Sequence, residues 1–180
     1  MEKITITEAL SELQLIKKKA EKKAGTVLQN LTKPKHVPDQ LEKEGGSREF
    51  LRREMQAISD LNDRYVRLKG AIAKANLSNL ITINSKSMFI HDWLIWKRDI
   101  AQKEISQART IYTDVKRQMD THQRAPQVYK DDKDGTMKLL EIEPNVDYSD
   151  YLKKTEELED TFEKLDGQLS LKNATIVVEI

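Results

Sequence analysis

The sequence predicts a mainly α protein organised around a long antiparallel coiled-coil hairpin. Two segments carry apolar residues every three or four positions, the spacing of a stripe that packs on a partner helix. No proline occurs between residues 39 and 125, so long unkinked helices can form there. Between the stripes, residues 76–87 are rich in Asn and Ser, which favours a reversing loop.

The predicted hairpin runs from Ser47 to about His122. We expect its two stripes to meet in one buried seam, which places Leu68 close to Ile105 or Ala108. The first stripe comprises Ile58, Leu61, Tyr65, Leu68, Ile72, Ala75 and Asn79, and the second comprises Ala101, Ile105, Ala108, Tyr112, Val115 and Met119.

An N-terminal helix over residues 5–31 is expected to pack with the hairpin. Thr5 and Glu8 have the spacing of a capping box, which marks a helix start. The opposite face of this helix is lysine-rich between Lys17 and Lys23. This cluster is either a phosphate-binding patch or a solvated helix face, and we favour the solvated face because no aromatic residue or Gly-rich loop accompanies it.

Residues 32–46 contain two prolines and two glycines and are interpreted as a linker. If the linker is ordered, a neighbouring subunit is a candidate for what holds it in place. Ser47 is expected to cap the helix that follows.

Beyond residue 122 the pattern becomes that of a small α/β appendage. Short strands are expected at 127–130 and 136–143 around an Asp-Gly turn. A further helix is expected to begin at Asp147 and to stop at Gly167. The β-branched segment 174–180 predicts a terminal strand, which pairs either within the chain or with another subunit. The predicted domains are therefore a helical-hairpin domain, 1–122, and the appendage, 123–180.

Composition limits the classes of partner. Charged residues make up 34% of the chain, with 31 Lys and Arg against 30 Asp and Glu, so no basic excess favours nucleic-acid binding. No cysteine is present, which excludes disulfides and thiolate chemistry. No stretch predicts a signal peptide or a membrane span, and we expect a protein made and folded in the cytoplasm.

The sequence predicts no catalytic, cofactor-binding or metal-binding site. The histidines His36, His91 and His122 lack the spacing of a helical zinc site. The segment 130–141 resembles a calcium loop at Asp132 and Asp134, but Lys130 stands where the first carboxylate ligand is required. We therefore expect a protein that is not an enzyme, with no cofactor, no metal and no small-molecule substrate.

The second arm of the hairpin is the third predicted helix of the chain and begins near Ser85 or Ser87. Its start is more apolar than one partner helix requires. Either the first helix or another chain must cover the excess, because large apolar patches are rare on monomers. Arg98 and Asp99 directly follow this cluster and are expected to form an ion pair. The residues predicted to lie at an interface are Met88, Phe89, Trp93 and Trp96 here, and Ile176 and Val178 in the terminal strand.

The chain carries short helix-forming segments at residues 6–10, 13–18, 64–76, 87–93 and 97–100, the last with an Arg-Asp pair at residues 98 and 99. These segments resemble parts of the septicolysin-like proteins, small helical-hairpin proteins of bacteria and their phages. The similarity covers roughly residues 5–120. The resemblance implies a helical, oligomeric protein with relatives in phage structural gene clusters, and it implies no catalytic residues.

Together, these observations predict a non-enzymatic structural or interaction protein. We expect a self-associating component of a bacteriophage virion, such as a fibre, decoration, neck or tail protein, which contacts itself and other virion proteins. The alternatives are a cytoplasmic scaffold or assembly factor, and an enzyme or metal protein built within a helical bundle.

Overall fold

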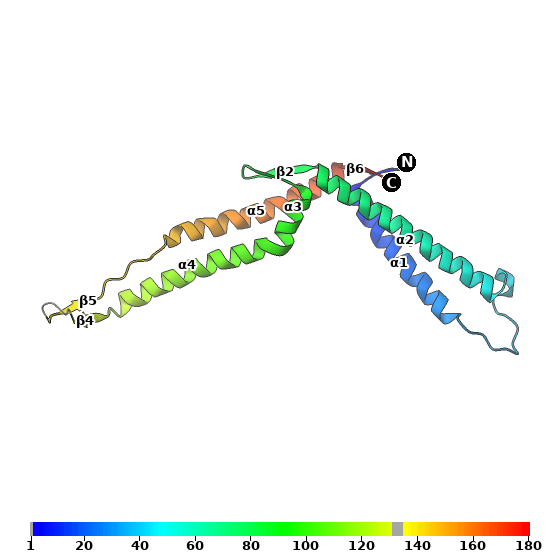
Figure 1. Cartoon of the computed structure of the whole chain (residues 1–180), viewed down its shortest axis with the longest axis horizontal. Coiled ribbons are helices and arrows are strands. Elements are labelled where there is room, and N and C mark those ends of the chain that lie inside the picture. Colours follow the sequence, from blue (N-terminus) through cyan, green and yellow to red (C-terminus); the bar gives the residue numbers. More distant parts are fainter. Residues whose placement is uncertain (1, 131–134) are drawn as a thin grey trace. The chain divides into compact units, whose positions relative to one another are not determined.

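The computed structural model of the chain describes residues 2–130 and 135–180 and is mainly helical, which confirms the predicted fold class (Figure 1). Its long helices are α1 (Ile6–Gln29), α2 (Ser47–Ser78), α4 (Ala101–Arg124) and α5 (Tyr148–Thr175). Shorter helical segments are η1 (Glu42–Glu44), α3 (Ile90–Ile95) and the π-helix η2 (Trp96–Ile100). The strands are β1 (Lys3–Thr5), β2 (Leu80–Ile83), β3 (Lys86–Phe89), β4 (Val128–Lys130), β5 (Met137–Leu139) and β6 (Val177–Glu179).

The chain divides into two compact units. Unit 1 is Met1–Leu80 with Leu169–Ile180, and unit 2 is Ile81–Gln168. The division predicted after residue 122 differs from this one for two reasons. Most of α5 pairs with α4 in unit 2, and β6 returns to pair with β1 in unit 1.

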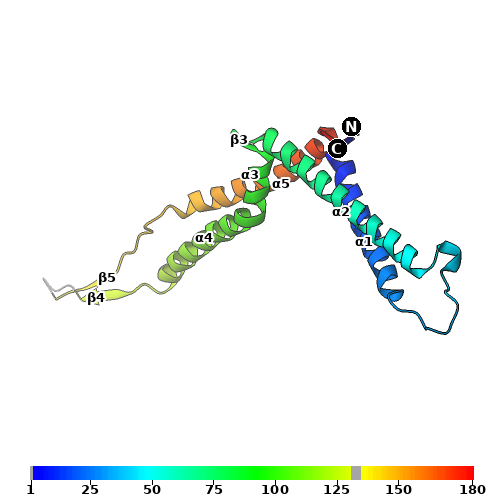
Figure 2. The ribbon, with the colours of Figure 1, turned by 45° about the vertical axis from the view of Figure 1, so that its right-hand side comes forward.

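Unit 1 is a helical hairpin of α1 and α2. Helix α1 begins with the predicted capping box: the Glu8 backbone N–H donates to Thr5 Oγ1 at 3.2 Å, and the Thr5 N–H donates to Glu8 Oε2 at 2.7 Å. The two helices lie side by side in Figures 1 and 2. Leu68 and Ile72 of α2 share a core with α1, so the expected seam of Leu68 with Ile105 or Ala108 is wrong. The buried residues of this core are Ile6, Ala9, Leu13, Ile16, Leu68, Ile72 and Val178.

The open end of this hairpin is closed by the first and last strands. β1 pairs antiparallel with β6, with Ile4 opposite Val178. The Ile6 backbone N–H donates to Ile176 O at 3.0 Å, which extends the pairing into the start of α1. The predicted terminal strand therefore pairs within its own chain.

Unit 2 begins with the β2–β3 hairpin, where the sequence predicts a loop. Asn84 and Ser85 at its turn both have positive φ, 48° and 67°, as a tight two-residue hairpin turn requires. Helices α4 and α5 then lie side by side in Figures 1 and 2. Ion pairs Lys97–Asp166 and Arg109–Glu159 join the two sides of this pair.

Helix α5 starts where the sequence predicts and ends later. The Ser149 backbone N–H donates to Asp147 Oδ1 at 2.9 Å, so Asp147 caps the helix as expected. The predicted stop at Gly167 is wrong, because α5 continues to Thr175. Leu165 and Leu169 are buried on either side of the glycine, and this packing outweighs the cost of about 1 kcal/mol of a helical glycine.

The two halves of the chain repeat one order of elements: strand, helix, connection, helix, strand. β1–α1–α2–β2 forms the first half, and β3–α3–α4–α5–β6 forms the second. The last strand of each half pairs with the first strand of the other half. β2 pairs with β3, and β6 pairs with β1. Three buried residues of α2 and β2 recur 97 positions later in α5 and β6: Leu68 with Leu165, Ile72 with Leu169, and Ile81 with Val178. We refer to these as equivalent positions.

Candidate interaction surface

The predicted interface tryptophans form part of the core of the chain. Trp93 is 1% exposed, and its indole N–H donates to Ile81 O at 2.9 Å. The Trp96 indole donates to Glu104 Oε2 at 3.0 Å, and the two rings meet edge to face with centroids 5.5 Å apart. The indole donors are satisfied and the rings are covered. Both tryptophans are therefore buried within the chain, and their expected place at an interface stays a prediction.

The π-helix η2 accommodates the apolar excess at the start of the third helix. Buried residues here are spaced by three and four positions, except from Trp96 to Ala101, where the spacing is five. The π-helical turn contains one extra residue. Trp96 and Ala101 can therefore both face the core, and Ile100 is exposed. The predicted pair also forms here: Arg98 donates to both carboxylate oxygens of Asp99, at 2.8 and 2.7 Å. This ion pair raises the pKa of Arg98 and lowers the pKa of Asp99.

The remaining predicted interface residues differ in exposure. Phe89 is exposed and Met88 is half-buried, both on β3. Val178 is buried in the core of unit 1, and Ile176 packs against that core. Of these four, only Phe89 offers a largely free side chain to a partner.

The polar motifs show no clustered chemistry. No group of three or more His, Cys, Asp or Glu within residues 2–130 and 135–180 has the arrangement of a metal site. Asp132 and Asp134 of the calcium-like segment lie outside the described residues. In the lysine cluster of α1, Lys23 pairs with Glu54 of α2 at 2.9 Å, so part of the cluster serves the hairpin itself.

The most exposed apolar element of unit 2 is the hairpin of β4 and β5. Val128 lies opposite Leu139, and Lys130 lies opposite Met137. Because side chains alternate along a strand, these four residues share one face of the hairpin. Val128, Met137 and Leu139 are 56%, 65% and 63% exposed, so this face is uncovered. We call it the apolar hairpin face.

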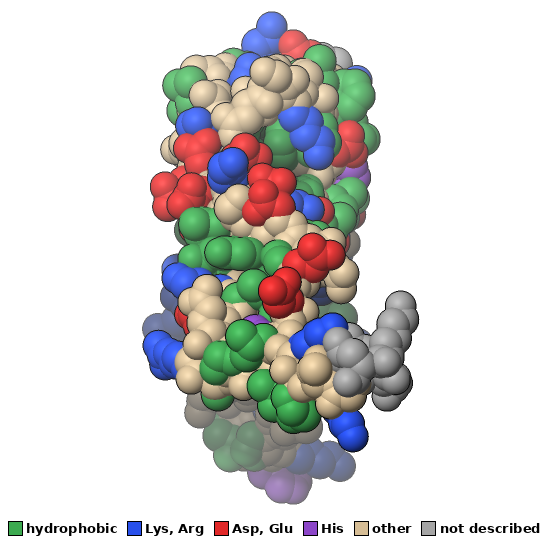
Figure 3. Space-filling view, turned by 90° about the vertical axis from the view of Figure 1, so that its left-hand side faces the viewer, with side chains coloured by type: hydrophobic (Ala, Val, Ile, Leu, Met, Phe, Trp, Pro, Cys, Tyr) green, Lys and Arg blue, Asp and Glu red, His purple; other side chains and the backbone are tan. Residues whose placement is uncertain are grey.

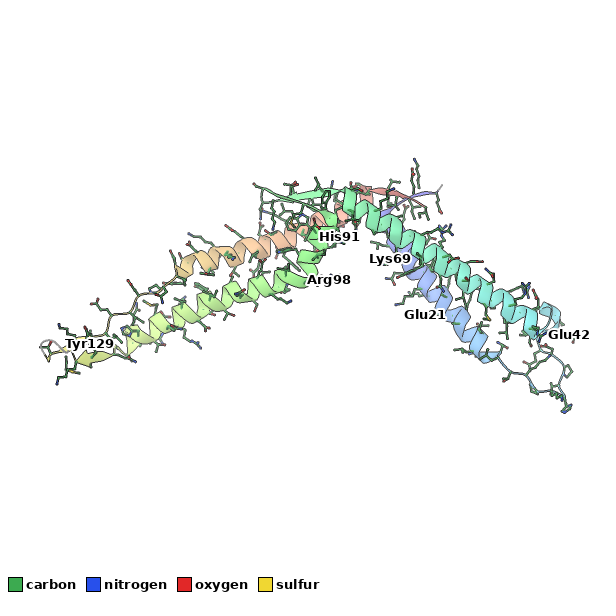
Figure 4. The ribbon with its side chains drawn as sticks, viewed as in Figure 1. Glu21, Glu42, Lys69, His91, Arg98 and Tyr129 are labelled. Atoms are coloured by element: carbon green, nitrogen blue, oxygen red, sulfur yellow. The ribbon has the colours of Figure 1, made fainter. Side chains whose placement is uncertain are left out.

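The figures place this hairpin at a free end of unit 2. Tyr129, labelled in Figure 4, lies with Lys138 on the opposite face of the hairpin. Figure 3 looks onto the end of the molecule where β4 and β5 lie, and hydrophobic side chains are visible at the surface there. The prediction of short strands around the Asp-Gly turn is confirmed by their pairing, although the second strand ends at Leu139.

The equivalent connection in the other half of the chain is built differently. Residues 30–46 are organised by Asp39, whose carboxylate accepts hydrogen bonds from Lys33, from the Leu41 backbone N–H, and from both the N–H and hydroxyl of Ser47. The linker is therefore held by its own chain. In contrast to the β4–β5 hairpin, it exposes few large apolar side chains, chiefly Leu31 and Val37.

Comparisons with known proteins add no identity to this geometry. No protein-family model, characterised protein or solved structure matches the chain. Among the helices of the described residues, none combines the length and apolar character needed to cross a membrane.

Proposed function

We propose that this chain is a non-enzymatic structural or interaction protein that self-associates through the apolar hairpin face. The observation that carries the proposal is the exposure of Val128, Met137 and Leu139 on one side of a two-stranded sheet. An isolated hairpin is only marginally stable in water, and three or more strands or a packed face are needed for independent stability. A partner that covers this face supplies the missing burial.

A second copy of the chain fits this face for electrostatic reasons. The formal net charge is +1, so two copies approach without strong mutual repulsion. The hairpin itself combines both signs, with Lys130 on the apolar face and Glu141 and Glu143 directly after β5. Two hairpins related by a two-fold axis can place the lysine of one copy near the carboxylates of the other.

The proposal is tested by light scattering coupled to size-exclusion chromatography. The wild-type chain is expected to elute with a mass above the 20.8 kDa of one copy. Replacing Val128 and Leu139 together with Lys is expected to return the mass to one copy, because four added positive charges then face each other in a dimer, beside the two Lys130 side chains. The matched control is Val66→Lys, an exposed position on α2, which should leave the mass unchanged.

Two results would contradict the proposal. Either the double variant keeps the wild-type mass, or the wild-type chain stays a single copy at every concentration. Circular dichroism of the double variant distinguishes loss of association from loss of folding, since both positions are exposed and helicity should persist.

The finer proposal is a component of a bacteriophage particle, as a fibre, decoration, neck or tail protein. It is supported by the resemblance of short segments to septicolysin-like proteins, and a cytoplasmic scaffold is the alternative. Mass spectrometry of purified particles separates the two: a virion component remains in finished particles at a stoichiometric level, whereas a scaffold or assembly factor is absent from them.

A further inference from the structure

An open groove lies on unit 1 between α1, α2 and the last turns of α5, and its volume is about 560 Å³. Its floor is partly apolar, with the buried Leu13 and the half-buried ring of Tyr65. Its polar lining includes Ser11, Lys17, Lys69, Ser170 and Asn173. Lys69 is labelled in Figure 4 in the half of α2 that leads to β2.

The polar groups of this groove have no partners among the described residues. Neither lysine forms an ion pair there, and neither serine nor Asn173 makes a side-chain hydrogen bond there. Elsewhere in unit 1, Lys23 pairs with Glu54 and Arg64 binds Glu2 and Glu12, so these two cations already have anionic partners. No carboxylate lines the groove, so the two ammonium groups give it a local positive potential.

The second half of the chain provides an internal comparison. Lys69 is equivalent to Asp166, and Tyr65 is equivalent to Phe162, at the same spacing of 97 positions. In unit 2, Asp166 pairs with Lys97, whose ammonium also lies 5.2 Å from the centre of the Phe162 ring. The acid at this position of unit 2 is therefore paired within the chain. In unit 1 a lysine stands at the equivalent position, so an anion from solution can bind there.

We propose that this groove binds a small phosphate-bearing ligand, either a phosphate ester or a pyrophosphate. Two lysines on different helices act as point charges for phosphate oxygens, and the neighbouring hydroxyl and amide groups supply neutral donors. No arginine lines the groove, so anion recognition there rests on the point charges of the two lysines and on the neutral donors. Tyr65 and Leu13 provide a surface for the uncharged part of the ligand. The site is independent of the proposed self-association, and it departs from the expectation that the chain has no small-molecule ligand.

The test is a titration of the full chain with inorganic pyrophosphate, followed by amide chemical shifts in ¹H–¹⁵N spectra at constant ionic strength set with chloride. Shifts are expected to concentrate on residues of α1, α2 and α5 that line the groove. Lys17→Gln and Lys69→Gln should each weaken binding about tenfold, the loss of one charged hydrogen bond. The matched control is Lys18→Gln, the neighbouring exposed lysine outside the groove, which should bind as the wild type does.

Citrate, a tricarboxylate, is the comparison ligand, and it should bind more weakly than pyrophosphate. The proposal is overturned if Lys18→Gln weakens binding as much as Lys17→Gln, because the ligand is then attracted by the general positive charge of the helix face and not by the groove. It is also overturned if citrate binds as well as pyrophosphate, or if no shifts localise to the groove. A fall in oligomeric mass of Lys69→Gln would likewise overturn it, because the groove would then be a protein interface.

Discussion

The carboxylate of Asp39 accepts a hydrogen bond from the backbone N–H of Ser47 at 2.9 Å and another from its hydroxyl at 2.5 Å. The side chain of a linker residue therefore caps α2, and Ser47, predicted to be the cap, is the first residue of the helix. Gly45 and Gly46 take positive φ values of 93° and 89° to bring the chain into this position, which side chains with a Cβ adopt only with strain.

Loss of the Asp39 carboxylate is expected to loosen the linker. Hydrogen bonds from Lys33, Ser47 and Leu41 hold the pKa of Asp39 far below its usual range. A carboxyl group with a lowered folded-state pKa contributes stability above its unfolded pKa of about 4, and this contribution is lost as the pH falls through the folded-state value. Asp39→Asn should lower the melting temperature at pH 7. As the pH falls below about 4, the melting temperature of the variant should decrease less steeply than that of the wild type.

Hydrogen exchange is the most direct measurement for this variant, because faster exchange should be confined to residues 33–50. Asp63→Asn is the control, since Asp63 is an exposed residue of α2 without a side-chain hydrogen bond in the described residues. Equal melting curves for the two variants would show that Asp39 does not hold the linker.

Leu68→Asp is expected to unfold unit 1. Leu68 is completely buried against α1, and an unpaired charge buried in this core costs several kcal/mol. Val66→Asp is the control on the same helix, because Val66 is 68% exposed and surface substitutions usually stay within about 0.5 kcal/mol. Urea unfolding followed by circular dichroism measures both, and a Leu68→Asp protein of wild-type stability would refute the core described for unit 1.

Trp93→Ala is expected to destabilise the folded chain, although the sequence predicts Trp93 at an interface. The ring is buried and its N–H is bonded to Ile81 O, so truncation costs about 3–5 kcal/mol through the cavity and the unpaired carbonyl. Phe89→Ala removes an exposed aromatic ring from the strand just before α3 and should cost much less. If Trp93→Ala instead lowers the oligomeric mass at unchanged stability, Trp93 lies at an interface.

The sequence predicts the helices better than their partners. The capping residues Thr5 and Asp147 act through local hydrogen bonds, and each is found where the sequence places it. The two strands predicted around the Asp-Gly turn also pair, while Asp134 of the turn lies outside the described residues. Local sequence does not determine which helix packs against α2. The apolar stripes of α1 and α4 have the same three and four spacing, so either helix offers α2 a similar surface. The π-helix could not be predicted from the spacing of apolar residues. A regular helix would bury Ile100, four positions after Trp96, whereas the structure buries Ala101.

The candidate sites were less accessible to sequence analysis. Val128, Met137 and Leu139 read as ordinary strand residues until the structure shows that nothing covers their shared face. The groove residues lie on three helices, and Lys17 could be singled out only as one member of a lysine run. The spacing of 97 positions is visible only when burial is compared between the two halves.

The repeated order of elements leads to a prediction about connectivity. The backbone groups of Glu2 and Ile180 are hydrogen-bonded to each other, at 3.4 and 3.1 Å, so a short Gly-Ser linker can join the two ends. If the halves are equivalent, the β2–β3 turn corresponds to this junction. A circular permutant that begins at Ser85 and ends at Asn84 should then keep the wild-type helicity and melt within a few degrees of the wild type.

A permutant opened at Gly70 is the matched control. It carries the same linker but cuts α2 next to Leu68, between two buried residues of the unit 1 core, and it should lose most of its cooperative unfolding. Circular dichroism during heating compares the three proteins. A permutant opened at the β2–β3 turn that melts no higher than the Gly70 permutant would contradict the equivalence of the halves, because the turn would then contribute a constraint that the β1–β6 junction cannot replace.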